Sequence, residues 1–203
     1  PQGHWLEVSS SRVQDADNGQ DCMVCVIHDI DGRKRREIEA ARKQALDPAT
    51  SAYRFKPGMD AIAAARVGAD AGQLVVVEID GFANIVRDYG IPFGDVLLNE
   101  LAKVMRTFNH NRGDHDAILM RVGAGQFAYW LPGKCAGDAI GEATELQRRF
   151  ARLVRPGVLE LSFHVGVASA EDVRNTSELL RRARTALQAS MEHRAACACW
   201  DPS

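Results

Sequence analysis

The sequence predicts an α+β domain with a ferredoxin-like antiparallel sheet, preceded by a β-hairpin and a linker helix. Three observations predict this fold. From residue 73 onward the apolar segments follow the order strand, helices, hairpin, helix, strand, which is a β-α-β-β-α-β arrangement with extra elements. A glycine-containing turn at 123–125 joins two apolar strands. A charged stretch without glycine or proline separates this region from β-rich residues near the N-terminus. We expect helices on one face of the sheet and a partial cover on the other.

Composition excludes several classes of partner. The chain has 203 residues, of which 46% are hydrophobic, enough for a substantial core. Its 25 basic and 27 acidic residues are well mixed and give a net charge of −2, so neither nucleic acid nor a membrane surface is an expected partner. No apolar run reaches the roughly 18 to 20 residues of a membrane span, and residues 1–5 lack a signal-peptide pattern. We therefore expect a cytoplasmic location.

The cysteines predict neither a disulfide framework nor a metal site. Their number is odd, five, which fits a reducing compartment. Cys22 and Cys25 have CxxC spacing, but residues three apart on a strand point to opposite faces, so one metal ion does not easily take both. We expect them to be small buried hydrophobic residues, and we expect no cofactor.

The N-terminal elements form a second hairpin. Residues 5–13 and 22–29 are β-rich, and they flank residues 15–19, which contain an Asn-Gly turn signal. Two strands alone are marginal in water. This hairpin is therefore expected to be the remnant of a larger sheet or to pack on another part of the protein.

Residues 33–46 form the predicted linker helix. An apolar stripe of Ile38, Ala41, Ala45 and Leu46 runs along an otherwise charged surface. Such a narrow stripe suits pairing with a second copy in a short parallel coiled coil, and packing against its own domain is the alternative. The basic run at 33–36 is expected to be a solvated face.

The remaining elements follow in order from local patterns. Apolar periodicity, breakers and capping residues predict helices at 58–66, 82–89, 94–108, 136–153 and 176–193, the last capped by Thr176 or Ser177. Apolar runs predict strands at 73–79, within the hairpin 118–131, at 158–168 and at 197–200.

The turn of the central hairpin is the candidate functional element. Gly123 and Gly125 bracket Ala124 and leave a nearly bare backbone, which phosphate groups often approach closely. A purely structural turn is the plainer interpretation, because small residues are common at hairpin tips.

Two neighbouring patterns carry a family resemblance. The hairpin reads Arg-x-Gly-small-x-x-Phe from Arg121 to Phe127, and Glu78-Ile79-Asp80 closes an upstream apolar strand. Together they resemble the signature of GGDEF domains, the diguanylate cyclase family, over residues 47–203, which implies the nucleotide cyclase palm fold. Asp47 and Thr50 match the start of that family's domain. Residues 1–31 resemble the C-terminal end of a PAS sensor domain, which leaves 32–46 as the linker helix.

The resemblance also implies that the catalytic acids are missing. Glu78 stands at the first metal carboxylate, Gly125 at the second, and Gln126 at the acid that assists catalysis. No catalytic residue is therefore assigned, and the signature Gly123, Ala124, Gly125, Gln126, Phe127 is degenerate. The vestigial nucleotide-binding positions are Glu78, Asp80, Phe82, Asp95 and Arg194. Ala83, Val86 and Ser190 replace other ligand-binding residues, and residues 112–116 lack the Arg-x-x-Asp product site.

A domain that keeps the family's structural residues but lacks its metal-binding and nucleotide-binding side chains is expected to have a regulatory function. The resemblance implies a catalytically inactive domain in a bacterial cyclic-di-GMP signalling protein, between a PAS sensor and an output domain, as in FimX-like PAS-GGDEF-EAL proteins. The expected partners are those other domains and a second copy through the linker helix. Two alternatives remain: a weak cyclase that uses Glu78 and Asp80, and a GTP-sensing domain without turnover.

Overall fold

The computed structural model describes residues 3–14, 21–67, 71–111, 117–152, 161–193, 195 and 197–200. The chain divides into two compact units, Pro1–Gln44 and Ala45–Ser203. Each unit is described by itself below. No helix among the described residues is both long enough and apolar enough to cross a lipid bilayer.

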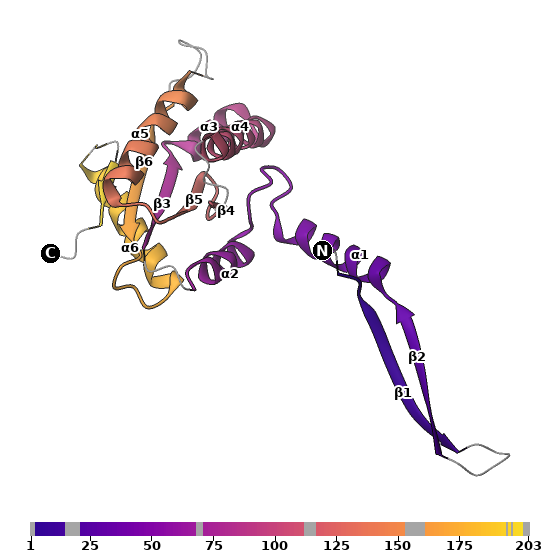
Figure 1. Ribbon diagram of the computed structural model, residues 1–203. Helices are drawn as coiled ribbons and strands as arrows, with labels where there is room; N and C mark the ends of the chain where they lie inside the picture. The colour runs from indigo at the N-terminus through magenta and orange to yellow at the C-terminus, as the bar shows by residue number, and fades with distance from the viewer. Residues whose placement is uncertain are drawn as a thin grey trace. The chain divides into compact units, whose positions relative to one another are not determined.

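The first unit contains the expected N-terminal hairpin. Strands β1 (Leu6–Gln14) and β2 (Asp21–Asp29) pair antiparallel, with Leu6 opposite Asp29 (Figure 1). Every residue of both strands is exposed within the described chain. The expectation that Cys22 and Cys25 are buried is therefore wrong, since both are exposed free thiols. The predicted turn at 15–19 lies outside the described residues.

Helix α1 (Asp31–Ala45) follows the hairpin and begins two residues before the predicted start. The side chain of Asp29 accepts a hydrogen bond from the Asp31 backbone N–H at 2.9 Å, which satisfies a free donor at the helix start. Ile38 is 58% exposed, as a pairing stripe requires. Leu46 lies outside the helix, because it forms a β-bridge with Tyr53, so the predicted stripe is one residue too long.

The second unit is built on a five-stranded sheet in the order β4-β5-β3-β6-β7 (Figure 1). Its strands are β3 (Gly72–Ile79), β4 (Ile118–Arg121), β5 (Gln126–Pro132), β6 (Phe163–Ser169) and β7 (Cys197–Cys199). All neighbours pair antiparallel except β6 and β7, which are parallel. The central strands β4, β5, β3 and β6 pair antiparallel as predicted, and β7 adds one parallel pair at the edge, so the sheet is mixed.

Helices cover both faces of the sheet, so the second face, for which a partial cover was expected, is also covered by helices. The helices are α2 (Phe55–Ala65), α3 (Phe82–Tyr89), α4 (Ile91–Asn111), α5 (Ala136–Ala151) and α6 (Thr176–Glu192). Val75 and Val77 of β3 pack in one core with residues of α3, α4 and α5. Leu74 and Val76, which point the other way, pack in a second core with residues of α2 and α6.

Several element boundaries differ from the sequence pattern. Helices α2 and α4 each begin three residues earlier than predicted, and α5 ends at Ala151. Strand β6 begins at Phe163, later than the predicted start at residue 158. Residues 161 and 162 are not in a strand, and residues 158–160 lie outside the described residues. Asn175 caps α6 in place of Thr176 or Ser177: its Oδ1 accepts a hydrogen bond from the Glu178 N–H at 2.8 Å.

Tyr53 ties the start of the second unit to the sheet. Its N–H donates to the Leu119 carbonyl at 2.9 Å, and its carbonyl accepts from the Arg121 N–H at 2.8 Å. The same residue bridges to Leu46. The segment 46–53 therefore lies against the outer side of β4.

Candidate functional site

The tip of the β4–β5 hairpin is held by hydrogen bonds from within the chain. Val122 N–H donates to the Gln126 carbonyl at 3.0 Å and closes the turn. The Arg121 guanidinium donates to the Ala124 carbonyl at 3.2 Å, and Arg184 of α6 donates to the Val122 carbonyl at 3.0 Å. The Gly125 carbonyl accepts from the Ile79 N–H at 3.1 Å. Two arginines and a strand thus fix the backbone of the tip.

Arg121 also connects the hairpin to the segment that follows the linker helix. Its Nη1 lies 3.3 Å from Asp47 Oδ1, which also accepts hydrogen bonds from the Thr50 hydroxyl and N–H at 2.8 and 3.0 Å. Burial raises the pKa of Asp47, but the Thr50 hydrogen bonds and the Arg121 charge outweigh it, so the pKa lies below its ordinary value. Asp47 is therefore an ionised link between residues 47–50 and the hairpin.

The two residues at the metal and acid positions pair with each other. Glu78 of β3 lies opposite Gln126 of β5 in the sheet register, and both are half-buried. Gln126 Nε2 donates a hydrogen bond to Glu78 Oε2. A neutral amide therefore donates to the Glu78 carboxyl group, which the family resemblance predicts at the first metal position.

Gly125 has no room for a side chain. A Cβ atom at this position would lie 2.7 Å from the Cβ of Phe82 and 2.8 Å from its Cγ, which is too close for two carbon atoms. Phe82 itself is buried, with 9% exposure, and its ring also lies beside Gly94. The structure therefore places Phe82 in the core beneath the hairpin tip, where it excludes any carboxylate at residue 125 unless the tip moves.

The two aspartates among the vestigial positions are exposed and lie on different elements. Asp80 follows β3, and its Oδ2 accepts a hydrogen bond from the Ser162 hydroxyl at 3.0 Å. Asp95 lies in the first turns of α4. Val86, on the preceding helix α3, is half-buried. Arg194 lies outside the described residues. Glu78, Gln126 and Phe82 therefore cluster at the hairpin, whereas Asp80 is engaged with Ser162.

Ser190, which replaces a lysine of the resemblance, is fully buried. Its hydroxyl donates to the Ala195 carbonyl at 2.6 Å, and His164 Nδ1 lies 3.3 Å from the same hydroxyl. The opposite ring nitrogen of His164 lies 3.9 Å from Asp80 Oδ2. The residue at this position therefore joins the C-terminal end of α6 to the sheet and presents no charge to a phosphate group.

Glu78 is the carboxylate that pairs with Gln126 at the hairpin, and metal-dependent phosphoryl transfer would need partners for it. Such a reaction needs carboxylates that jointly hold divalent cations. Across the part of the chain that the structure describes, no three His, Cys, Asp or Glu side chains are arranged to hold a metal ion.

The contact of Arg184 with the hairpin was not predicted from the sequence. Its only signal was an arginine on the exposed face of the predicted α6 helix.

Comparison with known proteins gives a consistent assignment. A family model described as "Diguanylate cyclase, GGDEF domain" matches residues 59–196. The diguanylate cyclase DgcM of Escherichia coli K12 is 28% identical over 177 residues, which are 83% of this chain but 41% of that relative, so the chain spans about two fifths of its length.

Two solved structures show the same fold. The coiled coil and GGDEF domain of DgcB from Caulobacter crescentus, in complex with c-di-GMP, superimposes with a TM-score of 0.69 at 22% identity and covers 83% of this chain and 92% of that one. The FimX GGDEF domain from Pseudomonas aeruginosa gives a TM-score of 0.63 at 22% identity, with coverage of 76% and 97%. Since the family model covers more than half of the chain and the fold agrees with these structures, the chain belongs to the GGDEF family.

Proposed function

We propose that this GGDEF domain is a catalytically inactive regulatory module that transmits a signal in a cyclic-di-GMP signalling protein. In this proposal, residues 1–31 are the C-terminal end of a PAS domain, residues 32–46 are the linker helix, and residues 47–203 receive the signal. An output domain of the EAL type follows, as in FimX-like proteins.

The pairing of Gln126 with Glu78 is the main observation that supports the proposed loss of catalysis. A carboxylate at residue 126 would repel Glu78 unless cations lay between them. The amide instead stabilises the pair without a metal ion, through a hydrogen bond to a charged group. Gly125 supplies no ligand, and Phe82 fills the space that a side chain there would need.

The connection from Asp47 to the hairpin supports a transmission function. Asp47 follows α1 by two residues, and Arg121 joins it to the turn that would contact phosphate in an active relative. A displacement of α1 therefore acts on the hairpin through one ionised contact and the Tyr53 bridge. DgcB was solved with a coiled coil together with its GGDEF domain, which supports pairing of two chains along the linker helix.

An assay of nucleotide turnover tests the loss of catalysis. The purified chain, incubated with GTP and either Mg²⁺ or Mn²⁺, should form no c-di-GMP detectable by chromatography, while an active diguanylate cyclase under the same conditions forms it. Product that disappears in Glu78→Ala would overturn the proposal in favour of a weak cyclase.

Calorimetric titration with GTP tests the sensor alternative. We expect no saturable heat with or without Mg²⁺, because Val86 and Ser190 replace groups that would hold guanine and phosphate. Saturable binding without product would identify a GTP-sensing domain.

A further inference from the structure

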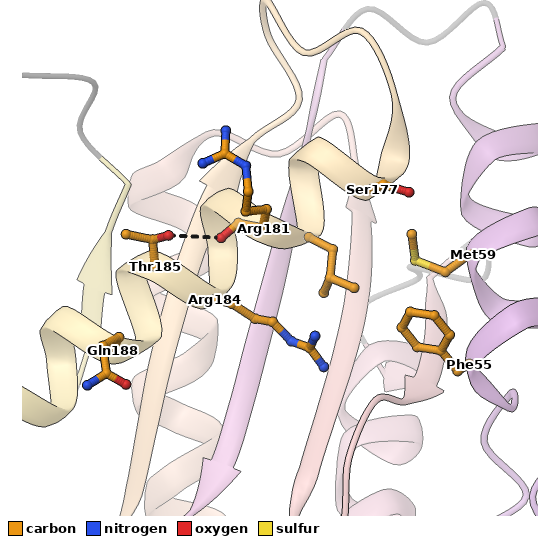
Figure 2. Close-up of a pocket in the computed structure, with 8 residues that line it drawn as sticks. Phe55, Met59, Ser177, Arg181, Arg184, Thr185 and Gln188 are labelled. Carbon is orange, nitrogen blue, oxygen red and sulfur yellow. Dashed lines mark hydrogen bonds between the residues drawn. The ribbon is translucent and has the colours of Figure 1, made fainter.

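A groove between α2 and α6 lies on the sheet face formed by Leu74, Val76 and Ala128. Glu78 and Gln126 belong to the same face, because side chains alternate along a strand. The volume of the groove is about 490 Å³. Figure 2 shows Phe55 and Met59 of α2 facing the exposed side of α6. Leu180, Arg181, Arg184 and Gln188 of α6 also contribute to its lining.

The apolar side of this groove carries unusually exposed groups. Phe55 is 48% exposed, and Met59 is half-buried beside it. A methionine thioether and a phenyl ring adapt to varied apolar side chains, and such surfaces are common where proteins bind partner helices. These two residues therefore supply an apolar anchor point.

The α6 side of the groove is positively charged. Arg181, Arg184 and Gln188 lie at i, i+3 and i+7, so they form one exposed stripe along the helix. None of the described residues that line the groove is acidic. Two acids of α6 flank the stripe. Glu178 forms an ion pair with Arg182 at 2.7 Å and also interacts electrostatically with Arg181, while Glu192 accepts a hydrogen bond from Gln188 at 3.0 Å. Among the described residues, neither acid forms an ion pair with Arg181 or Arg184.

The shape and the spacing of charge favour a peptide over a compact anion. The stripe from Ser177 to Gln188 is about 16 Å long at 1.5 Å per residue. Figure 2 shows Arg181 and Arg184 leaving α6 in different directions, so the two guanidinium groups do not converge on one phosphate. Separate carboxylates along a helix match this distribution, whereas phosphate recognition uses converging donors.

We propose that the groove between α2 and α6 docks an acidic amphipathic helix of a partner protein. An apolar side chain of that helix lies against Phe55 and Met59, and its carboxylates pair with Arg181 and Arg184. The docking site does not presuppose a loss of catalysis, because its residues are distinct from Glu78 and Gln126. Arg184 also donates a hydrogen bond to the Val122 carbonyl at the hairpin tip.

Selection of peptides from a random 12-residue phage-displayed library tests the proposal. The intact chain serves as bait, and the variant Met59→Glu serves as counter-bait to remove phage that bind elsewhere. We expect the enriched peptides to combine Leu, Phe or Trp with Asp or Glu at helical spacing. Enrichment of peptides without acids, or no enrichment over the counter-bait, would overturn the proposal.

Affinity measurements on one selected peptide locate its site. Arg181→Gln should weaken binding about two- to five-fold, because an exposed ion pair contributes modestly, and added salt should reduce this difference. Arg148→Gln on α5 is the matched control, since that exposed arginine lies on the other helical face of the sheet, and its affinity should be unchanged. Equal effects of the two substitutions, or displacement of the peptide by c-di-GMP or GTP, would contradict a peptide site on α6.

Discussion

Gly125→Ala tests whether Phe82 excludes side chains from the hairpin tip. The added methyl carbon would lie 2.7, 2.8 and 3.0 Å from three atoms of Phe82, so either the tip or the buried ring has to move. Overpacking of this kind costs about 1–3 kcal/mol. For a domain of this size each kcal/mol lowers the melting temperature by roughly 2–4 °C.

Gly141→Ala is the matched control for this measurement. Gly141 lies on the exposed side of α5, and a Cβ there meets no atom within 4 Å. Because alanine is the better helix former, this substitution should raise the free energy of unfolding by about 0.4–1 kcal/mol. The two Gly→Ala variants should therefore change stability in opposite directions.

Urea unfolding followed by far-ultraviolet circular dichroism measures both effects. In a Phe82→Ala background, which removes two of the three close atoms, Gly125→Ala should cost at least about 0.5 kcal/mol less than in the original chain. If Gly125→Ala is as harmless as Gly141→Ala, or if its cost is the same in both backgrounds, Phe82 does not constrain residue 125 and the reasoning fails.

Four further outcomes are expected. The double variant Gly125→Asp, Gln126→Glu should remain inactive with GTP and Mg²⁺, because a side chain at residue 125 lacks space and the phosphate contacts are still missing; turnover would show an intact pocket. Asp47→Asn should lower the free energy of unfolding by about 1–3 kcal/mol near pH 7. Because the pKa of Asp47 is lowered by folding, this difference is present above pH 4 and should shrink as pH falls below about 4; a pH-independent difference would contradict it. Burial raises the pKa of Cys197 to about 11, so its alkylation at pH 8, followed by mass spectrometry, should be on the order of 100-fold slower than in urea. Ile38→Asp should weaken self-association measured by sedimentation of a chain with the complete PAS domain, and an unchanged association constant would make α1 a spacer.

Most strands of the sheet were predictable because their signals are local. The apolar run in β3 and the glycine-containing turn at 123–125 each mark an element without knowledge of the rest. The coverage of both faces was also readable in principle. Leu74 to Val77 are consecutive apolar residues, which is typical of a strand buried on both sides, but the ferredoxin-like analogy favoured one helical face.

The features that sequence reasoning missed depend on distant partners. Three residues of β7 carry no local signal for parallel pairing, which the position of the preceding helix decides. The pairing of Gln126 with Glu78 requires the β3–β5 register, and Arg184 reaches Val122 only after α6 packs on the sheet. Asn175 was overlooked as a cap because Thr176 and Ser177 beside it are also good capping residues.

The contact of Tyr53 with β4 has a consequence for solubility. An outer strand with unpaired backbone groups can recruit a strand from another molecule and start aggregation. Tyr53 uses both its N–H and its carbonyl on Leu119 and Arg121, so a single residue blocks the middle of this edge. The opposite edge ends in β7, which is only three residues long. The domain therefore protects both borders of its sheet against intermolecular strand addition, and loosening the segment 46–53 would expose one of them.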